Sequence, residues 1–533
     1  MPATQVSPWW QTAIIYQIYP RSFQDSDGDG VGDLRGIIQR LDYLIELGVD
    51  AIWLSPIFCS PMADFGYDIS DYTDIDPLFG TLNEFDELLA AAHQRGLKLL
   101  LDLVPNHTSE QHPCFQESRS SRNSPKRDWY IWRDPAPDGG PPNNWLSEFG
   151  GSAWEFDANT GQYYYHAFLK AQPDLNWRNL EVRAAIQDVM RFWLRRGVDG
   201  FRVDVIWHLM KDSLFRDNPV NPDYEATQNP RRRLVPLYTT DLPEVHDVIA
   251  ELRSVVDEFE ERVLIGEIYL PLEKLVAYYG RDVRGCHLPF NFSLLGVEWR
   301  ARAIAELVEQ YESLLPAGRW PNWVLGNHDR PRIASRVGRD QARIAAMLVL
   351  SLRGTPTIYY GDEIGMVQVP IPPEQIRDPL EKNISGLGLG RDGARTPMQW
   401  DPGPNAGFST VDPWLALAAD FRSENVENAR RDATSIYHLH RRLIAARRAQ
   451  PALTLGSYHP ISAGGDLILY TRAHDGSRIL LALNLGADPI SVAFPQPVRG
   501  KVLVSCFADR DDEAVDGGIE LRPHEGLIIA LTA

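Results

Sequence analysis

The chain repeats one pattern from its start to about residue 360, and this pattern limits the folds open to it. Short apolar runs alternate with stretches whose apolar residues recur at helical spacing, such as 34–47, 82–95, 181–196 and 244–259. Strands that alternate with helices form parallel βαβ units, and eight such units are typical of a closed barrel. We therefore predict an α/β protein built on a (β/α)8 TIM barrel, with strands at 13–19, 50–56, 97–104, 200–205, 263–268, 287–292, 322–327 and 355–360.

The pattern is interrupted in three places. Pro, Gly, Asn, Ser and aromatic residues dominate 108–170, which predicts a domain inserted after strand 3. Residues 212–245 are long, charged and rich in proline, and we expect them to form a lid. After Pro451 short apolar runs follow one another without helices, which predicts an antiparallel β-sandwich domain. The predicted domains are the barrel at 1–107 and 171–452, the insert at 108–170 and the C-terminal domain at 453–533.

Charge and cysteine content limit the partners and the compartment. Lys and Arg number 53 against 72 Asp and Glu, so the net charge is 53 − 72 = −19. This balance argues against nucleic acid and anionic membranes and fits neutral or cationic small molecules. Cys59, Cys114, Cys286 and Cys506 are scattered without metal spacing, so we expect reduced thiols in a cytoplasmic protein. We see no signal peptide and no membrane span, and monomer and homodimer both stay open.

An acidic loop follows the first strand. Asp25, Asp27, Asp29 and Asp33 stand at positions 1, 3, 5 and 9 of a glycine-rich turn, and the Val31 carbonyl is available at position 7. This is the spacing of oxygen ligands in a calcium loop. Gly36 replaces the glutamate expected at position 12, so the loop is not an EF-hand. We predict a bound Ca²⁺ or Mg²⁺, and the alternative is a solvated acidic turn.

The strand at 200–205 carries two charges in an apolar setting. Side chains alternate along a strand, so Arg202 and Asp204 project to one face while Phe201, Val203 and Val205 point to the other. An adjacent arginine lowers the pKa of a carboxyl group, and a carboxylate nucleophile must stay unprotonated. The pair alone fits a nucleophile or a structural ion pair equally well.

Further polar residues follow other strands of the predicted barrel. Active sites of this fold lie at the carboxyl ends of the strands. A single polar residue there usually has a structural role, but here four strands contribute. Three carboxylates with Arg and His donors, without a phosphate loop or metal cluster, favour glycoside hydrolysis. These residues are Asp102, Asn106, His107, Arg202, Asp204, Glu267, His328 and Asp329.

The chemistry assigns a role to each carboxylate. Asp204 beside Arg202 is expected to stay ionised. Glu267 lies among apolar residues, which favours a raised pKa and the role of acid. Asp329 remains to hold sugar hydroxyls and to stabilise a positively charged transition state.

Several motifs resemble those of the α-amylase superfamily. Residues 102–107, 200–204, 266–267 and 327–329 are similar to its four ordered motifs, and 172–176 is similar to the fifth motif of its α-glucosidase and oligo-1,6-glucosidase branch. Residues 14–22, 66–69 and 395–400 also match that branch. The resemblance extends from about residue 8 into the C-terminal domain.

The resemblance implies a function for each matched residue. Asp204 would be the nucleophile of a retaining reaction, Glu267 the general acid/base and Asp329 the transition-state stabiliser. The residues implied to bind the transferred sugar are Asp64, Tyr67, His107, Phe168, Arg202, His328 and Arg395. The cation in the acidic loop would be structural, and 108–170 would be the B domain of the family.

The expected activity is an exo-acting α-glucosidase that releases glucose from short oligosaccharides. An ion pair between Asp64 and Arg395 would grip the terminal sugar and close the pocket behind it. Val205 beside the nucleophile favours some α-1,6 activity, so we expect both linkages to be cleaved. A transglucosylase, or an oligo-1,6-glucosidase with strong α-1,6 preference, stays open. A binding-only subunit is disfavoured because all three acids are present and no membrane anchor is seen.

Overall fold

Eight parallel strands form the centre of the computed structural model, which describes residues 7–494 and 498–532. Neighbours in the sheet follow the order β11-β10-β9-β5-β2-β1-β13-β12, so each strand lies beside the next one along the predicted barrel. The predicted TIM barrel is confirmed. The strands are β1 (Ile15–Ile18), β2 (Ala51–Leu54), β5 (Lys98–Leu103), β9 (Gly200–Val203), β10 (Val263–Ile268), β11 (Leu288–Asn291), β12 (Asn322–Val324) and β13 (Thr355–Tyr359).

Asn322 joins the two ends of this sheet. The backbone N–H of Asn291 on β11 donates to the Asn322 side-chain oxygen over 2.8 Å. The Asn322 amide in turn donates to the carbonyl oxygen of Pro289 over 2.5 Å. These bonds replace ladder bonds between β11 and β12 and leave the buried backbone groups paired, as a buried strand edge requires.

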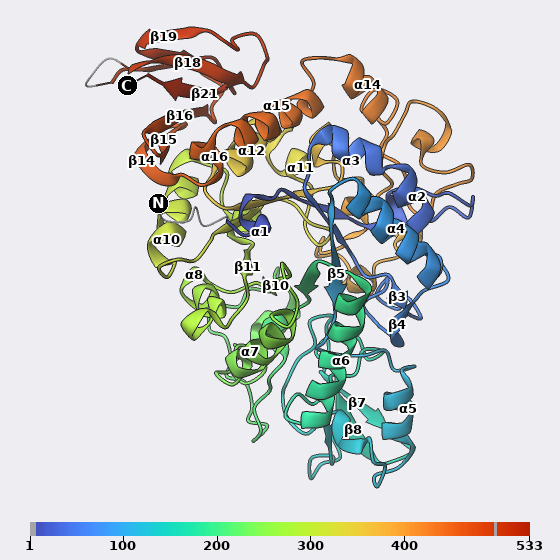
Figure 1. The fold of residues 1–533 in the computed structure, drawn as a ribbon. Helices are drawn as coiled ribbons and strands as arrows, with labels where there is room; N and C mark the ends of the chain where they lie inside the picture. The colour runs from blue at the N-terminus through green and yellow to red at the C-terminus, as the bar shows by residue number, and fades with distance from the viewer. Residues whose placement is uncertain (1–6, 495–497, 533) are drawn as a thin grey trace.

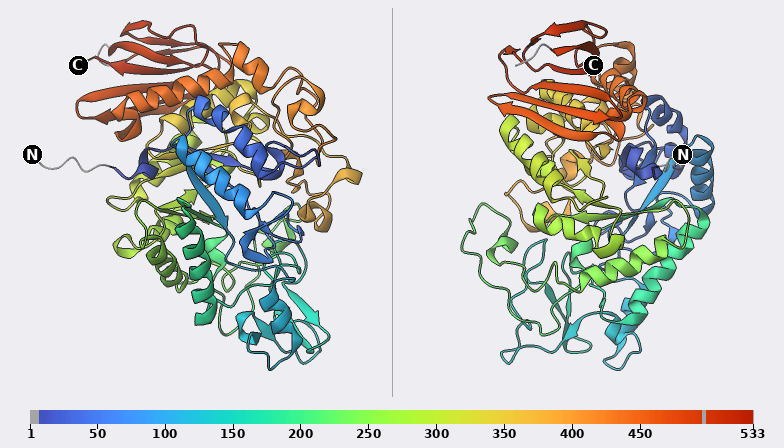
Figure 2. Two further views of the ribbon diagram at one scale, coloured as in Figure 1. Left: turned by 45° about the vertical axis from the view of Figure 1, so that its right-hand side comes forward. Right: turned by 60° about the vertical axis from the view of Figure 1, so that its left-hand side comes forward.

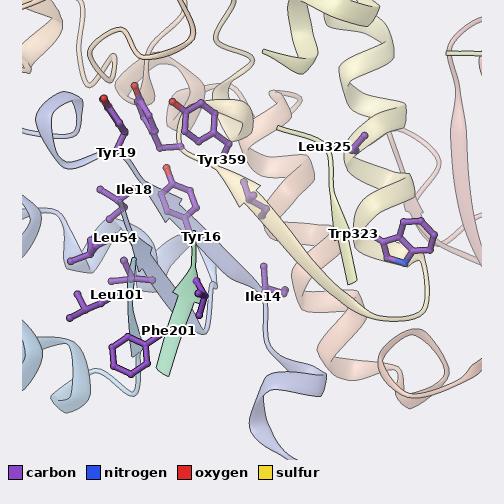
Figure 3. Close-up of a cluster of buried hydrophobic side chains, with 14 of the residues drawn as sticks. Ile14, Tyr16, Ile18, Tyr19, Leu54, Leu101, Phe201, Trp323, Leu325 and Tyr359 are labelled. Atoms are coloured by element: carbon purple, nitrogen blue, oxygen red, sulfur yellow. The ribbon is translucent and has the colours of Figure 1, made fainter. Parts of the chain in front are cut away.

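Alternation along the strands creates two separate cores. Tyr16, Leu54, Leu101 and Phe201 point outward and pack under the helices, as Figure 3 shows. The other face of the strands fills the barrel interior with a second cluster that includes Trp53, Ile265 and Phe290. On this inner face Asp102, Arg202 and Glu267 lie toward the carboxyl ends of β5, β9 and β10, so the strand period places these charged residues at one end of the barrel.

Helices cover the outside of the barrel (Figure 1). The predicted helix at 34–47 is two helices, α2 (Leu34–Gln39) and α3 (Leu41–Leu47). At the break the Arg40 guanidinium lies 4.1 Å from the ring centroid of Trp400 and donates to Gln24. The other long helices are α4 (Leu82–Gln94), α6 (Leu180–Arg196), α7 (Val245–Val256), α10 (Ala301–Leu314), α12 (Arg339–Ser351) and α15 (Ile436–Ala449).

Short helices lie at the turns between these elements. They are α1 (Trp9–Thr12), α5 (Pro113–Ser120), α8 (Leu272–Leu275), α9 (Ser293–Gly296), α11 (Ile333–Val337), α13 (Pro379–Asn383), α14 (Val426–Arg431) and α16 (Pro451–Thr454). A two-stranded sheet of β3 (Phe58–Cys59) and β4 (Asp71–Ile75) stands between β2 and α4. None of the described helices combines the length and the apolar character needed to cross a membrane.

Two further β structures lie at opposite ends of the barrel (Figures 1 and 2). The segment after β5 contains a three-stranded sheet of β6 (Trp132–Arg133), β8 (Gln162–Tyr165) and β7 (Trp154–Asp157). The C-terminal part contains a six-stranded antiparallel sheet, which shares a core with the two-stranded sheet β17–β20. Its strands are β14 (Ser457–Gly464), β15 (Leu467–His474), β16 (Ser477–Asn484), β17 (Ile490–Val492), β18 (Val498–Ser505), β19 (Ala514–Gly517), β20 (Ile519–Leu521) and β21 (Gly526–Leu531).

Gly200 at the start of β9 tests how tightly the barrel packs around the central strand. Its φ is +152°, and an added Cβ would lie 2.2 Å from the carbonyl oxygen of Val263 on β10. We expect Gly200→Ala to reduce the free energy of unfolding by about 2–5 kcal/mol, since it combines backbone strain with overpacking.

Gly96→Ala is the matched control. Gly96 also has a positive φ, of +76°, but an added Cβ would contact nothing within 4 Å. This variant should lose about 1–2 kcal/mol from backbone strain alone. Melting temperatures at one scan rate measure both variants, and equal losses would show that contact with Val263 contributes nothing.

Candidate active site

A cavity of about 640 Å³ opens at the carboxyl ends of the barrel strands. It collects residues that are far apart in the sequence, and seven predicted site residues line it: Asp64, Tyr67, His107, Phe168, Asp204, Glu267 and Asp329. The other three, Arg202, His328 and Arg395, are buried and contact these lining residues from below.

Arg202 on β9 is the centre of the charge network. Its Nη1 lies 2.7 Å from Asp102 Oδ1 and 2.9 Å from Asp204 Oδ1, and its Nη2 lies 2.8 Å from Glu267 Oε1. The guanidinium also packs 5.0 Å from the ring centroid of Trp53. One buried cation thus holds carboxyl groups from β5, β10 and the end of β9 in fixed positions.

The backbone turns sharply after this ion pair. The predicted strand at 200–205 ends at Val203, and Val205 has a φ of +37°, in the left-handed region that β-branched residues avoid. The turn directs the Val205 N–H to Glu267 Oε2 over 2.9 Å and places Val205 in the lining of the cavity. The prediction that Val205 faces away from Asp204 along a regular strand is wrong.

The pKa of Asp204 differs from the predicted low value. Burial and the neighbouring Glu267 raise the pKa of Asp204 well above its ordinary value, although Arg202 opposes them. The prediction that Arg202 keeps this pKa low is wrong, because burial and the neighbouring Glu267 outweigh the arginine. Burial also raises the pKa of Glu267, as predicted, and raises that of Asp102 to about 7.

Asp204 and Glu267 form a pair that shares a proton. The two carboxyl groups are hydrogen-bonded to each other, and each forms an ion pair with Arg202. Groups in direct contact cannot leave the 6.5–9.5 Å gap in which an inverting glycosidase places its water molecule. Such a pair ionises in two coupled steps, and the singly protonated state supplies one carboxylate and one carboxylic acid.

Asp329 has a different environment from this pair. Burial alone would raise its pKa, but His328, Arg395 and Arg391 outweigh burial and hold the pKa well below its ordinary value. Arg395 Nη2 lies 2.8 Å from Asp329 Oδ1, and Arg391 Nη1 lies 3.4 Å from the same oxygen. Asp329 is therefore an ionised carboxylate at the wall of the cavity.

The ion pair expected between Asp64 and Arg395 is a wrong prediction. Asp64 Oδ1 pairs with Arg391 Nη2 over 2.7 Å, and the same Nη2 lies 2.7 Å from Asp378 Oδ1. Arg395 is used instead by Asp329 and by the carbonyl oxygen of His328. Arg391 was missed because two arginines stand four residues apart on one loop, and residue type alone does not choose between them.

Both histidines of the site are neutral hydrogen-bonding groups. Burial lowers the pKa of His107 to about 4 and that of His328 to about 3. His328 Nε2 lies 2.7 Å from the Tyr67 hydroxyl, which donates to Asp102 over 3.1 Å. Because the Gln17 amide lies 2.8 Å from His328 Nδ1, we assign the proton of His328 to Nε2.

His107 is held by a buried polar network behind the cavity. Asn106 Nδ2 lies 3.1 Å from His107 Nδ1, and Asn106 Oδ1 accepts a hydrogen bond from the Lys211 ammonium over 2.7 Å. Lys211 pairs in turn with Asp174 over 2.5 Å. The Phe168 ring lies against His107, with 5.1 Å between the ring centroids. Sequence motifs indicated these residues but not Lys211.

Part of the predicted lid at 212–245 forms one side of the cavity mouth. Arg231 forms an ion pair with Glu148 of the insert. The amide of Asn229 donates to the Glu148 carbonyl oxygen over 3.2 Å, and that of Asn144 donates to the Asn218 carbonyl oxygen over 2.8 Å. The segment is therefore attached to the insert, and its residues Gln228, Asn229, Arg231 and Arg232 line the cavity.

The acidic loop lies outside the cavity lining. Ligand oxygens of Asp25, Asp27 and Asp29 all lie within 4.8 Å of one another, which is the donor set a divalent cation requires. Burial and the adjacent Asp29 raise the pKa of Asp27, so a cation there would relieve the repulsion. The Asp33 carboxylate accepts from Ser26 and Gly36 and caps α2. Val31 lies in the same loop and donates its N–H to Asp29.

Comparisons with known proteins agree with this geometry. Residues 17–456 match the family model of the alpha amylase catalytic domain, and residues 454–528 match a domain of unknown function, DUF3459. The chain is 41% identical to a probable alpha-glucosidase of Rhizobium meliloti, over 94% of this chain and 95% of that one. It is 40% identical to the oligo-1,6-glucosidase of Heyndrickxia coagulans, over 99% and 100%.

A solved structure is also similar. The crystal structure of an alpha-glucosyl transfer enzyme superposes with a TM-score of 0.93 at 42% identity. The superposition covers 99% of this chain and 100% of that one. The similarity thus extends through the barrel, the insert and the C-terminal domain.

A double-mutant cycle tests which arginine holds Asp64. We expect Asp64→Asn and Arg391→Gln to show a coupling of about 1–3 kcal/mol in the free energy of unfolding, since their charges are in contact and buried. The cycle of Asp64→Asn with Arg395→Gln is the control and should give at most about half of that value. Denaturant unfolding measures both cycles, and a larger coupling to Arg395 would contradict the observed pairing.

Proposed function

The chain belongs to the α-amylase family, and on that premise we propose that it is an exo-acting retaining α-glucosidase. It would release glucose from the non-reducing end of short α-glucosides through a covalent glucosyl-enzyme. The observation that carries this proposal is the contact of Asp204 and Glu267 with each other and with Arg202. Carboxyl groups this near to each other are typical of retaining glycosidases, which react by double displacement.

The proposed reaction uses the shared proton of the pair. With the proton on Glu267, the Asp204 carboxylate attacks the anomeric carbon while Glu267 protonates the departing oxygen. Glu267 then removes a proton from water, and the hydroxide displaces Asp204. Asp329, held ionised by Arg395 and Arg391, would stabilise the positive charge that develops on the sugar ring.

Exo action is supported by the buried part of the cavity lining around Asp64 and Arg391, which we call the closed end. Asp64, Arg391 and Asp378 form a buried ion cluster, and polar groups of this kind suit the hydroxyls of a terminal sugar. Tyr67 and His107, both buried, line the same end. We propose that one glucose unit fits there and that the rest of the substrate extends toward the mouth.

The linkage and the acceptor are less restricted by this geometry. Val205 lines the cavity beside the nucleophile, where an apolar contact is worth about 1–3 kcal/mol and biases selectivity without making it absolute. We propose that both α-1,4 and α-1,6 linkages are cleaved. Transfer of glucose to a sugar or alcohol instead of water is the second candidate, favoured by the similarity to the alpha-glucosyl transfer enzyme.

We propose a structural divalent cation, Ca²⁺ or Mg²⁺, in the acidic loop. Asp25, Asp27 and Asp29 would hold it with the Val31 carbonyl, while Asp33 shapes the loop through its helix cap. The ion would tie the end of β1 to α2 and take no part in the reaction. We also propose a cytoplasmic location, which the four unpaired cysteines support.

Two substitutions separate the proposed catalytic roles. Asp204→Asn should reduce kcat/KM by about 10³-fold or more for every α-glucoside, because no nucleophile remains. Glu267→Gln should reduce kcat/KM by about 10²–10⁴-fold for maltose, yet far less for 4-nitrophenyl α-glucoside, whose leaving group needs no proton. Release of nitrophenol and of glucose measures the two cases. Equal losses on both substrates would contradict Glu267 as the acid.

The stereochemistry and the pH profile are independent checks. NMR of the first product from maltose should show α-glucose, and initial β-glucose would overturn the retaining mechanism. kcat/KM should fall at low pH, where both carboxyl groups are protonated, and at high pH, where both are ionised. Burial raises both pKa values, so both limbs should lie above the range of exposed carboxylates. Glu267→Gln should remove the alkaline limb.

Removal of the proposed cation should destabilise the fold. A ligand present at 100 times its dissociation constant stabilises the native state by about 2.7 kcal/mol. We therefore expect excess chelator to lower the melting temperature, and Asp27→Asn to abolish that sensitivity. Asp223→Asn, an exposed substitution outside the loop, should keep it. An identical melting curve in chelator, with no metal found by elemental analysis, would exclude the ion.

A further inference from the structure

The mouth of the active-site cavity carries positive charge that the proposed reaction does not use. Four arginines line the cavity: Arg231, Arg232, Arg330 and Arg391. Two of them are engaged, since Arg391 pairs with Asp64 and Asp378 and Arg231 pairs with Glu148. Among the described residues, no carboxylate lies within ion-pair distance of Arg232 or Arg330.

The residues that line the cavity differ in how deeply they are buried. Asp204, Glu267, Asp64 and Tyr67 are buried, whereas Arg232 and Arg330 are exposed. These two guanidinium groups, which have no carboxylate within ion-pair distance among the described residues, are thus more accessible to solvent than the reacting carboxyl groups. The leaving group of the substrate, or the acceptor in transfer, occupies the accessible part of the cavity when the terminal sugar is at the closed end.

Arg330 is fixed next to the reacting groups. It directly follows Asp329, and its guanidinium carbon lies 5.0 Å from the ring centroid of Tyr269. The Tyr269 hydroxyl accepts from Asn327 over 3.0 Å, and its ring packs on Phe292. The guanidinium also interacts electrostatically with Asp329 and Glu267. The ring contact and a hydrogen bond to Tyr269 fix Arg330, whose side chain is exposed at the cavity.

Arg232 lines the same cavity from the 212–245 segment. It lies in the short 3₁₀ helix at Pro230–Arg233, which the Asn229 side chain caps at its start. Arg231 anchors this helix to the insert, so the position of Arg232 is set even though its side chain is exposed. Arg233 belongs to the same helix but does not line the cavity. Besides the anchoring Arg231, the helix thus has Arg232 at the mouth and Arg233 outside the cavity.

We propose that the mouth recognises an anionic group, a phosphate or a carboxylate, on the leaving or acceptor sugar. Guanidinium groups bind both anions through paired N–H donors, and Arg232 and Arg330 line the same cavity. The net charge of −19 offers an anion no long-range attraction, so the preference arises from local contacts. This inference rests on the proposed α-glucosidase function and specifies its substrate class.

The main experiment compares two substrates that differ in one group. The probes are maltose and maltose carrying a phosphate on O6 of its reducing-end glucose. We expect kcat/KM to be about 5–20-fold higher for the phosphorylated sugar at low ionic strength and to converge within about 2-fold at 0.5 M NaCl. Arg232→Gln and Arg330→Gln should each reduce this ratio, and the double variant should bring it near 1.

Arg233→Gln is the matched control and should leave the ratio unchanged. An equal effect of this variant would reveal a general surface charge instead of a site and would overturn the proposal. A wild-type ratio near 1 at low salt would also overturn it. If both arginine variants lost maltose and its phosphate equally, the arginines would serve neutral hydroxyl groups, and the proposal would be wrong.

Inhibition by products distinguishes the two anions. Glucose, glucose 6-phosphate and glucuronate are compared as inhibitors of 4-nitrophenyl α-glucoside hydrolysis. Stronger inhibition by glucose 6-phosphate alone identifies a phosphate site, and stronger inhibition by both acids identifies a general anion site. Nitrophenol release also distinguishes failure of the proposed function from failure of the anion site. No release by the wild type would refute the proposed function, whereas release with equal inhibition by all three sugars would refute only the anion site.

Discussion

The geometry of the active site depends on one buried cation, Arg202. Its guanidinium contacts Asp102, Asp204 and Glu267, which come from three neighbouring strands. Three carboxyl groups around one positive charge cannot all ionise in a dry interior, so the cluster must retain protons. Retention of a proton is what acid catalysis needs at neutral pH. In the proposed reaction, the ion cluster that fixes the strand ends would thus also supply the catalytic proton.

The same constraint explains why Asp329 behaves differently. Its ion pairs are with Arg395 and Arg391, which come from a separate loop and form no ion pair with Asp204 or Glu267 among the described residues. The cavity therefore contains a carboxyl pair with raised pKa values beside a carboxylate with a lowered one. Environments that separate pKa values in this way distinguish an acid from an electrostatic stabiliser. Residue identity alone does not make this distinction, because all three are acidic.

The sequence predicted what depends on strand period and failed where several side chains compete for one partner. Alternation put Arg202 and Asp204 on one face, and the structure confirms their contact. The pKa of Asp204 could not be predicted, because it depends on how deeply the carboxyl group is buried and on how close Glu267 lies to it. The partner of Asp64 was missed for the same reason, since Arg391 and Arg395 differ only in where the loop carries them. The left-handed turn at Val205 could not be predicted from the sequence either, because no glycine or asparagine stands there.

The closed end and the mouth of the cavity are built from different parts of the chain. The closed end uses the barrel strands and the loop that carries Arg391 and Arg395, where buried ions fix each side chain. The mouth uses the 212–245 segment, whose position depends on surface contacts with the insert such as Arg231 with Glu148. Ion pairs of this kind tolerate substitution better than a buried cluster does. Substitutions in the mouth can therefore alter which leaving group or acceptor the cavity takes in the proposed reaction. The carboxyl cluster around Arg202 would stay the same.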